Sequence, residues 1–192
     1  MTIFYTSDWH LGHLKVSQLR GFATPAEHDA QLVENCLAVV QPGDTIRFLG
    51  DMSINSGNHV MEVLSYLPTR NELFSGNHDK THTEIFRHVA AQKIALWHHV
   101  FDVILDEAVV EIAGRPVTLS HFPYFSWGDG PTRGPARFTH LRPWESETSI
   151  LLHGHTHGPE IEHGRSFHVG VDAHNLQLVP EERIAEWVRS LA

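Results

Sequence analysis

The sequence predicts one α/β domain whose first half alternates strands with helices and whose second half is richer in strands. Two observations favour this fold class. Up to about residue 90, β-prone apolar runs alternate with stretches in which apolar residues recur at helical spacing. After Phe101, short apolar runs are separated by turn residues. The 192 residues suffice for a sizeable core but leave little for a second module, so we expect residues 1–192 to form a single domain.

Three strand–helix units account for the first half. The predicted strands are 3–6, 45–49 and 72–74, and the predicted helices that follow them cover 25–40, 61–67 and 85–90. The first helix has a clear start signal, because Thr24-Pro25 combines a capping residue with a proline suited to the first turn. Successive strand–helix units favour a partly parallel sheet.

The second half is expected to add short strands and to close with a helix. The apolar runs predict strands at 103–105, 109–112, 117–119, 149–152 and 167–171. Pro180 starts the last helix, which continues through Ile184 and Trp187 to Leu191.

Composition disfavours several classes of function. Acids outnumber bases, 23 to 14, and the resulting charge of −9 argues against long nucleic acid as a partner, since that binding needs clustered Lys and Arg. No apolar run approaches the roughly 20 residues that cross a bilayer, and no basic segment typical of a signal peptide opens the chain. We therefore expect a cytoplasmic protein without a membrane partner, and its oligomeric state stays open. The single cysteine, Cys36, lies in an apolar stretch typical of a core.

Potential metal ligands follow nearly every predicted strand. Histidine occurs 17 times, more often than Lys and Arg together, and it is the commonest metal ligand in proteins. The ligand positions, in chain order, are Asp8, His10, Asp51, Asn77, His121, His155 and His157. Open α/β sheets place their ligand sites at the carboxyl ends of strands. These side chains are therefore expected to meet at one site.

Spacing and donor atoms together predict two metal ions. Side chains two residues apart project to the same side of an extended chain, which pairs Asp8 with His10 and His155 with His157. Glycines at positions 50, 76 and 154 would let the backbone turn closely beneath the ligands. Oxygen and nitrogen donors suit Mn, Fe, Zn or Ni. Seven ligands exceed the need of one tetrahedral ion and suit two ions about 3.5 to 4 Å apart that share a carboxylate.

The order of these blocks resembles a known family. D-x-H, G-D, G-N-H-D, a lone H and G-H-x-H follow one another between Ile3 and Asp172, as in the calcineurin-like metallophosphoesterase superfamily, especially its small single-domain members from bacteria and phages. The resemblance implies an α/β/β/α sandwich, in which two facing β-sheets are flanked by helices. It also implies ligand roles: Asp8, His10 and His157 for the first metal, Asn77, His121 and His155 for the second, and Asp51 as the bridge.

The same resemblance implies a hydrolytic mechanism. Two divalent ions lower the pKa of a bridging water to about 7, and the resulting hydroxide would attack phosphorus. The family's catalytic histidine falls on His78, which would protonate the leaving oxygen or hold the phosphoryl group. Asp79 would orient the imidazole of His78 as a hydrogen-bond acceptor.

The block around Asp51 helps to choose among substrates. Gly50-Asp51 continues as Met52-Ser53, whereas the protein Ser/Thr phosphatases and symmetrical dinucleoside polyphosphate hydrolases of the superfamily continue it as Asp-Arg-Gly. We therefore expect small phosphodiesters as substrates, cyclic nucleotides included. Two alternatives stay open: a phosphomonoesterase acting on a small phosphate ester or nucleotide, and a non-catalytic protein-binding scaffold of the same fold.

Other features allow more than one interpretation. Segment 122–137 is rich in aromatic residues and carries Arg133 and Arg137. It would stack a nucleobase and clamp a phosphate, or form a surface loop pinned by its own aromatic side chains, and both interpretations stay open. His13 follows the first block closely, but we expect that it is not a ligand. The other histidines are expected to be solvated or to cap helices, apart from two expected in the core: His153 and His168.

Overall fold

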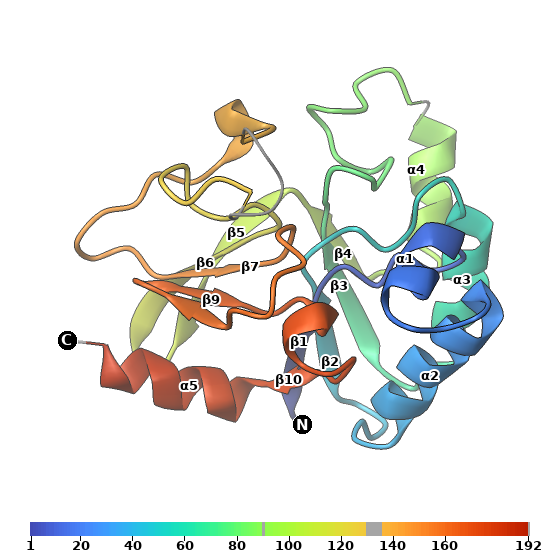
Figure 1. Cartoon of the computed structure of the whole chain (residues 1–192), viewed down its shortest axis with the longest axis horizontal. Coiled ribbons are helices and arrows are strands. Elements are labelled where there is room, and N and C mark those ends of the chain that lie inside the picture. The colour runs from blue at the N-terminus through green and yellow to red at the C-terminus, as the bar shows by residue number, and fades with distance from the viewer. Residues whose placement is uncertain (90, 130–135, 192) are drawn as a thin grey trace.

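Two five-stranded β-sheets face each other and are flanked by helices, so the predicted architecture is confirmed (Figure 1). The computed structural model describes residues 1–89, 91–129 and 136–191. The first sheet has the order β10-β1-β2-β3-β4, in which β1 to β4 are parallel and β10 pairs antiparallel with β1. Its strands are β1 (Ile3–Thr6), β2 (Thr45–Phe48), β3 (Arg70–Phe74), β4 (Val103–Leu105) and β10 (Val179–Pro180).

The second sheet has the order β5-β6-β7-β9-β8. Its strands are β5 (Glu107–Ile112), β6 (Arg115–Ser120), β7 (Leu151–His153), β8 (Glu162–His163) and β9 (Ser166–His168). The hairpin between β5 and β6 turns at Ala113 and Gly114, which both have positive φ, as a tight hairpin turn requires. The next pairs, β6 with β7 and β7 with β9, are parallel. The carboxyl ends of β6 and β7 therefore lie side by side.

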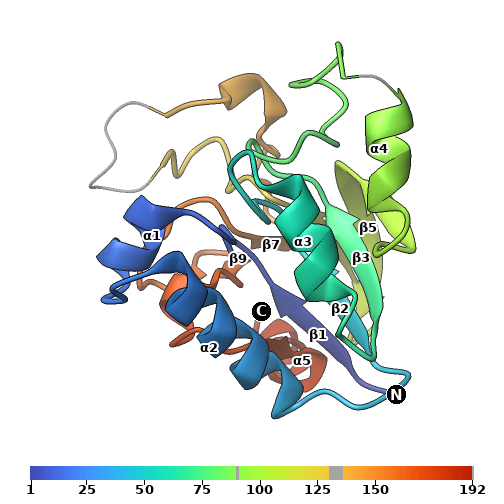
Figure 2. The same cartoon turned by 90° about the vertical axis from the view of Figure 1, so that its right-hand side faces the viewer.

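The helices are α1 (Leu14–Leu19), α2 (Pro25–Leu37), α3 (Gly57–Leu64), α4 (Ala91–Trp97) and α5 (Glu181–Ser190), with 3-10 turns at Thr139–Leu141 and Val171–Ala173. Figure 2 shows α2 and α3 running alongside β1 on one face of the first sheet. The expected start of α2 is confirmed: Thr24 and Glu27 form a capping box around Pro25. No helix in the described ranges is long and apolar enough to span a membrane.

Two hydrophobic clusters hold these layers together. Between the sheets, Tyr5 and Phe74 pack with Leu119 and Phe167 of the opposite sheet, and Val188 of α5 joins them. On the other face of the first sheet, the buried cluster includes Phe48, Leu73, Leu32 of α2 and Val60 of α3. Each large apolar side chain buried in this way contributes about 1.5 to 3 kcal/mol. The packing fixes the strand ends of one sheet beside those of the other.

The predicted helix at 85–90 is wrong. The described part of this segment forms turns, and α4 begins only at Ala91. The imidazole of His82 accepts the backbone N–H of Ile85, and the side chain and N–H of Thr83 bind Asp106. The local bond of His82 competes with a helical ladder, and Asp106 ties Thr83 to a distant part of the chain. The strand predicted at 167–171 is also shorter than expected, because a 3-10 turn begins at Val171.

Several histidines expected at the surface are buried. His28, His82 and His174 are at most 6% exposed. Each has a polar partner that offsets the cost of burial: Asp29 for His28, the backbone N–H of Ile85 for His82, and the carbonyl of His168 for His174. The core positions expected for His153 and His168 are confirmed, since neither is exposed.

Cys36 is predicted to be chemically inert in the native protein. It lies on the buried face of α2 with 1% of its surface exposed, and burial raises the pKa of its thiol to about 12. Because the thiolate is the reactive form, we expect no reaction with a disulfide reagent such as DTNB at pH 8. Unfolding in guanidinium chloride should release one reactive thiol per chain. Rapid labelling of native protein would contradict this placement.

Candidate metal centre

The seven predicted ligands meet where the strands of both sheets end. The first sheet contributes Asp8, His10, Asp51 and Asn77 after β1, β2 and β3, and the second contributes His121, His155 and His157 after β6 and β7. Six of them are buried, whereas the side chain of His157 is 15% exposed. Their ligand atoms form two neighbouring clusters.

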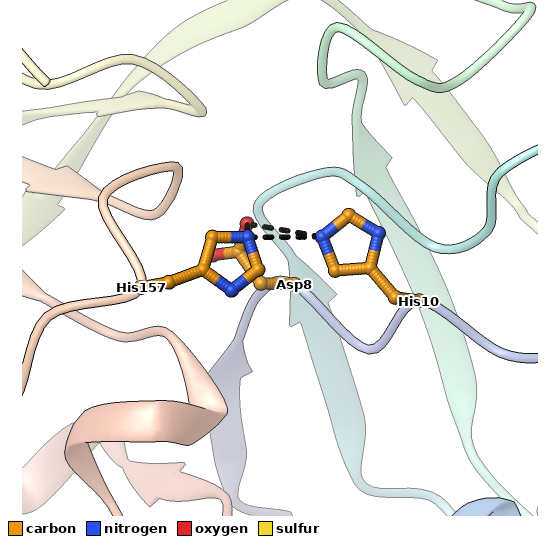
Figure 3. Close-up of side chains that lie close together, drawn as sticks. All are labelled: Asp8, His10 and His157. Atoms are coloured by element: carbon orange, nitrogen blue, oxygen red, sulfur yellow. Dashed lines mark hydrogen bonds and ion pairs between the residues drawn. The ribbon is translucent and has the colours of Figure 1, made fainter. Parts of the chain in front are cut away.

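The first cluster consists of Asp8, His10 and His157 (Figure 3). Oδ1 of Asp8 lies 3.4 Å from Nε2 of His157 and 3.9 Å from Nε2 of His10. The two imidazole Nε2 atoms are 3.0 Å apart. One carboxylate oxygen and two imidazole nitrogens therefore converge on the same point.

The second cluster is centred on His121. Its Nε2 lies 3.3 Å from Oδ1 of Asn77 and 3.2 Å from Nδ1 of His155. Its Nδ1 lies 2.8 Å from the carbonyl oxygen of Leu49. Donation of the Nδ1 proton to that carbonyl leaves a lone pair on Nε2, which is the tautomer that a metal ligand needs.

Asp51 lies between the two clusters. Its Oδ2 is 3.7 Å from Nε2 of His10 and 3.5 Å from Nε2 of His121. Its Oδ1 accepts the backbone N–H of His78 at 2.9 Å. The position of Oδ2 is the one expected of a carboxylate shared by two ions.

One buried atom gives an independent test of fit to divalent ions. Oδ1 of Asp8 is buried without a hydrogen-bond partner in the described part of the chain, and such an atom normally has a partner or binds an ion. Within residues 1–89, 91–129 and 136–191, two sets of side chains bring ligand atoms within 4.8 Å of one another: Asp8, His10 and His157, and Asp8, Asp51 and His121. The oxygen and nitrogen donors of these sets suit divalent transition metals.

Comparison with known proteins agrees with this geometry. Residues 1–171 match the profile of the calcineurin-like phosphoesterase superfamily domain. The chain belongs to this superfamily. It is 35% identical to Gene 66 protein of Mycobacterium phage D29 over 98% of this chain and 96% of the relative, and 34% identical to Gene 66 protein of Mycobacterium phage L5 over 98% and 94%. A crystal structure of a protein of unknown function from Aquifex aeolicus shares the fold, with a TM-score of 0.70 and 23% identity over 97% of this chain and 98% of that one.

Two acidic residues of this phosphoesterase domain contact candidate-ligand histidines at the ring nitrogen that faces away from the cluster. Oδ2 of Asp172 lies 2.8 Å from Nδ1 of His157, and Oδ1 of Asp129 lies 3.2 Å from Nε2 of His155. Each carboxylate can accept the proton of the nitrogen that faces away from its cluster. The other nitrogen then carries the lone pair toward the cluster. Sequence reasoning assigned Asp172 no role beyond its place in the resemblance, and no local pattern marked Asp129.

Arg20 is a further residue that sequence reasoning missed. Its guanidinium donates to the backbone carbonyls of Asp8 at 2.8 Å and Trp9 at 3.2 Å, and it forms two bonds to Asp172, at 2.8 and 2.7 Å. One side chain thus fixes the loop that carries Asp8 and the carboxylate that holds His157. No local pattern marks Arg20, because these contacts cross up to 152 positions of the sequence.

The backbone conformation at the ligand positions differs from the extended chain that was expected. Five of the seven ligand residues have positive φ: Asp8 (62°), His10 (48°), Asp51 (55°), His155 (73°) and His157 (51°). The ligand pairs therefore do not project from extended chain, as the two-residue spacing suggested. Left-handed residues reverse the direction of the chain sharply, and they turn both members of each pair into the site.

The expected close approach at glycine is confirmed at Gly50 and Gly154. A Cβ atom at Gly154 would lie 2.6 Å from Oδ2 of Asp8, and one at Gly50 would lie 2.5 Å from the backbone nitrogen of Gly76. Gly50 also has a φ of +84°, which favours glycine. The first sheet's ligand loops could not pack together, or against Gly154, with a larger residue at these positions.

Asp79 does not orient His78 as expected. Both of its carboxylate oxygens accept backbone N–H groups, from Asp51 at 2.7 Å, Met52 at 2.9 Å and Gly76 at 2.8 Å. Burial and the neighbouring Asp51 carboxylate raise the pKa of Asp79 to about 7. The Asp79 carboxylate therefore links the loop that carries Asp51 to its own loop, which carries Asn77. Within the described residues, the imidazole of His78 lies nearer to Asp51, with Nε2 3.9 Å from Oδ2.

Burial and neighbouring imidazoles lower the pKa of His10 and of His78. Burial and His157 lower the pKa of His10, and burial and His121 lower the pKa of His78 to about 4. For Asp8, burial alone would raise the pKa, but the surrounding imidazoles outweigh it and hold the carboxyl well below its usual range. At neutral pH His10 therefore offers a neutral imidazole and Asp8 an ionised carboxylate, which are the forms that bind metals.

Segment 122–137 is described only up to Asp129 and from Ala136, so Arg133 lies outside the described residues. Phe122 is buried against His121, and Phe125 stacks on Trp144, with ring centroids 4.6 Å apart. These aromatic contacts hold the described part of the segment in place, which agrees with the interpretation of a surface loop. Arg137 lines a pocket together with His10, His78 and His157, so this arginine is at the site.

His13 caps a helix, in agreement with the expectation that it is not a ligand. Its Nδ1 accepts the backbone N–H of Val16 at 3.2 Å and closes the first turn of α1. Its ring centroid lies 6.4 Å from that of His10. It is therefore a neighbour of the site that supplies a matched control for substitutions there.

Arg20→Ala is predicted to weaken metal binding at the first cluster. The variant loses the bonds that hold the Asp8 loop and Asp172, and removal of such supporting contacts typically costs about 10- to 100-fold in metal affinity. Calorimetric titration of metal-free protein with Mn²⁺ or Zn²⁺ should show this loss for one of the two ions. Arg115→Ala is the control, because Arg115 bonds the carbonyls of Val188 and Leu191 instead. Unchanged affinity in folded Arg20→Ala protein would contradict the assignment.

Proposed function

We propose that this protein is a phosphodiesterase that uses two divalent ions to hydrolyse small phosphodiesters, cyclic nucleotides included. The observation that carries this proposal is the position of Asp51 between two ligand clusters, beside a pocket that His78 and Arg137 line. The proposed ligands are Asp8, His10 and His157 for one ion, Asn77, His121 and His155 for the other, and Asp51 for both. Mn, Fe, Zn and Ni all suit these donors.

The pocket beside the clusters has the size and charge for a small ester. Its volume is about 380 Å³, within the usual range of ligand pockets. Two of the described residues that line it are arginines. Arg20 is engaged with the ligand loops, whereas Arg137 forms an ion pair from Nε to Oδ2 of Asp129 at 2.9 Å and keeps 52% of its side chain exposed. An exposed guanidinium is suited to bind a phosphoryl group through paired hydrogen bonds. The chain's charge of −9 disfavours long nucleic acid as the substrate.

Ions bound at the clusters would supply an activated water and would neutralise charge that develops on the phosphoryl oxygens. The chain's own residues do the rest. His78 faces the pocket with 38% of its side chain exposed, where its imidazole N–H can donate to a phosphoryl oxygen or to the leaving oxygen. Arg137 would orient the phosphoryl group. No side-chain nucleophile is required.

The first test is metal-dependent hydrolysis of two esters by metal-stripped protein. We expect no activity without metal, and turnover of bis-p-nitrophenyl phosphate above that of p-nitrophenyl phosphate when Mn²⁺, Ni²⁺, Zn²⁺ or Mg²⁺ is added back singly. The Asp51→Asn variant should lose this activity, because a neutral amide replaces the carboxylate that is proposed to bind both ions. Preference for the monoester would identify a phosphomonoesterase instead. Two bound ions without turnover of either ester or of cyclic nucleotides would favour a protein-binding scaffold.

His78→Ala is predicted to lower kcat far more than metal affinity. General acid–base groups typically contribute about 10²- to 10⁴-fold, and His78 belongs to neither ligand cluster. Steady-state kinetics and calorimetric metal titration on the same preparation separate the two effects. His13→Ala is the matched control and should keep its activity, because His13 only caps α1. Full activity of His78→Ala would remove this residue from the mechanism.

A further inference from the structure

A second pocket adjoins the first at His78, which lines both. Its volume is about 460 Å³, and it is bordered by the loop after β2, by α3 and by α4. The two helices lie on the same side of the molecule in both views (Figure 1, Figure 2). Any ester held beside His78 therefore has open space on two sides, and the ligand clusters border one of them.

The lining of this second pocket favours a partly apolar ligand without positive charge. One wall is apolar and includes Met61, Ile94 and Trp97. The rim is polar and includes the exposed side chains of Asn55, Asn58 and Lys80. None of the described residues that line the pocket is acidic, although the chain carries 23 acids against 14 bases. An aromatic or aliphatic face with hydrogen-bonding edges matches this lining.

The aromatic residues Phe125, Trp127 and Trp144 do not line either of the two pockets beside His78. Phe125 and Trp144 line another pocket, which does not include His78. Trp127 stacks on His163, with ring centroids 4.7 Å apart and an interplanar angle of 3°. An organic group attached to a phosphoryl group at His78 would instead meet the wall formed by α3 and α4.

We propose that the pocket between α3 and α4 binds the nucleoside group of a nucleoside phosphodiester. This inference rests on the proposed function and narrows its substrate class. The base would pack against the apolar wall at Met61 and Trp97, and its polar edge would face the amide of Asn58. Lys80 on the rim would attract the anionic ester toward the pocket. Nucleoside recognition is thus assigned to this pocket and phosphoryl recognition to the clusters, His78 and Arg137.

The test compares two diesters with the same leaving group. The p-nitrophenyl esters of thymidine and adenosine 5′-monophosphate carry a nucleoside, whereas methyl p-nitrophenyl phosphate replaces it by a methyl group. With the metal-loaded protein, we expect KM for at least one nucleoside ester to be tenfold or more below KM for the methyl ester. Equal KM values for all three esters would overturn the proposal.

Two variants locate the effect in the pocket. Met61→Trp fills the space beside the apolar wall and should bring KM for the nucleoside ester close to that for the methyl ester. Lys80→Glu changes an exposed rim residue and should raise KM for the nucleoside ester severalfold. Lys15→Glu makes the same charge change on α1, outside the pocket, and should not alter the ratio of the two KM values. A ratio that neither pocket variant changes would overturn the assignment.

A direct binding measurement separates this proposal from the proposed function. Saturation-transfer NMR with thymidine and adenosine 5′-monophosphate should detect nucleoside protons in contact with the wild-type protein, and this signal should be lost in Met61→Trp. If no ester is hydrolysed but this binding is seen, the phosphodiesterase assignment fails and the nucleoside pocket stands. If turnover is seen without nucleoside preference or binding, the phosphodiesterase stands and the pocket assignment fails.

Discussion

The carboxylate of Asp8 joins the two sheets at the point where the site is built. Its Oδ2 accepts a hydrogen bond from the hydroxyl of Ser7 at 2.8 Å and from the backbone N–H of His155 at 3.0 Å, while its Oδ1 faces His10 and His157. One side chain of the first sheet therefore anchors the loop of the second sheet that carries two ligands. Both clusters depend on this link, because each draws side chains from both sheets.

The loops around the ligands are held in a backbone conformation that is unfavourable by itself. A non-glycine residue held in a sparsely populated backbone region costs on the order of 1 to 3 kcal/mol, and five ligand residues have positive φ. Polar contacts stabilise these loops: the carboxylate of Asp79 collects three N–H groups, and the guanidinium of Arg20 binds two carbonyls. The ligand atoms are thus positioned before any ion binds, which is a general requirement of precise sites.

Short local patterns in the sequence predicted the candidate ligands. Residues whose roles depend on contacts with distant parts of the chain were not predicted. Strand ends followed by Asp, Asn or His predicted that the seven candidate ligands would meet at one site, and these side chains do lie together. The role of Asp79 was missed because two of its partners, the N–H groups of Asp51 and Met52, belong to another loop. Arg20 and Asp129 were missed because nothing beside them in the chain marks them. The helix expected at 85–90 does not form, because its apolar spacing is outweighed by the local bond of His82 and by the bond of Thr83 to the distant Asp106.

The long separation between the ligands in sequence has a consequence for how the protein is made. His10 and His157 stand 147 positions apart, and folds that depend on contacts across such sequence distances form slowly. Until the second sheet packs against the first, His157 is not held beside Asp8 and His10, so the first cluster is incomplete. Ions that bind the native state alone shift the equilibrium toward it. Ions bound at the two clusters would therefore stabilise the protein only after both sheets have come together.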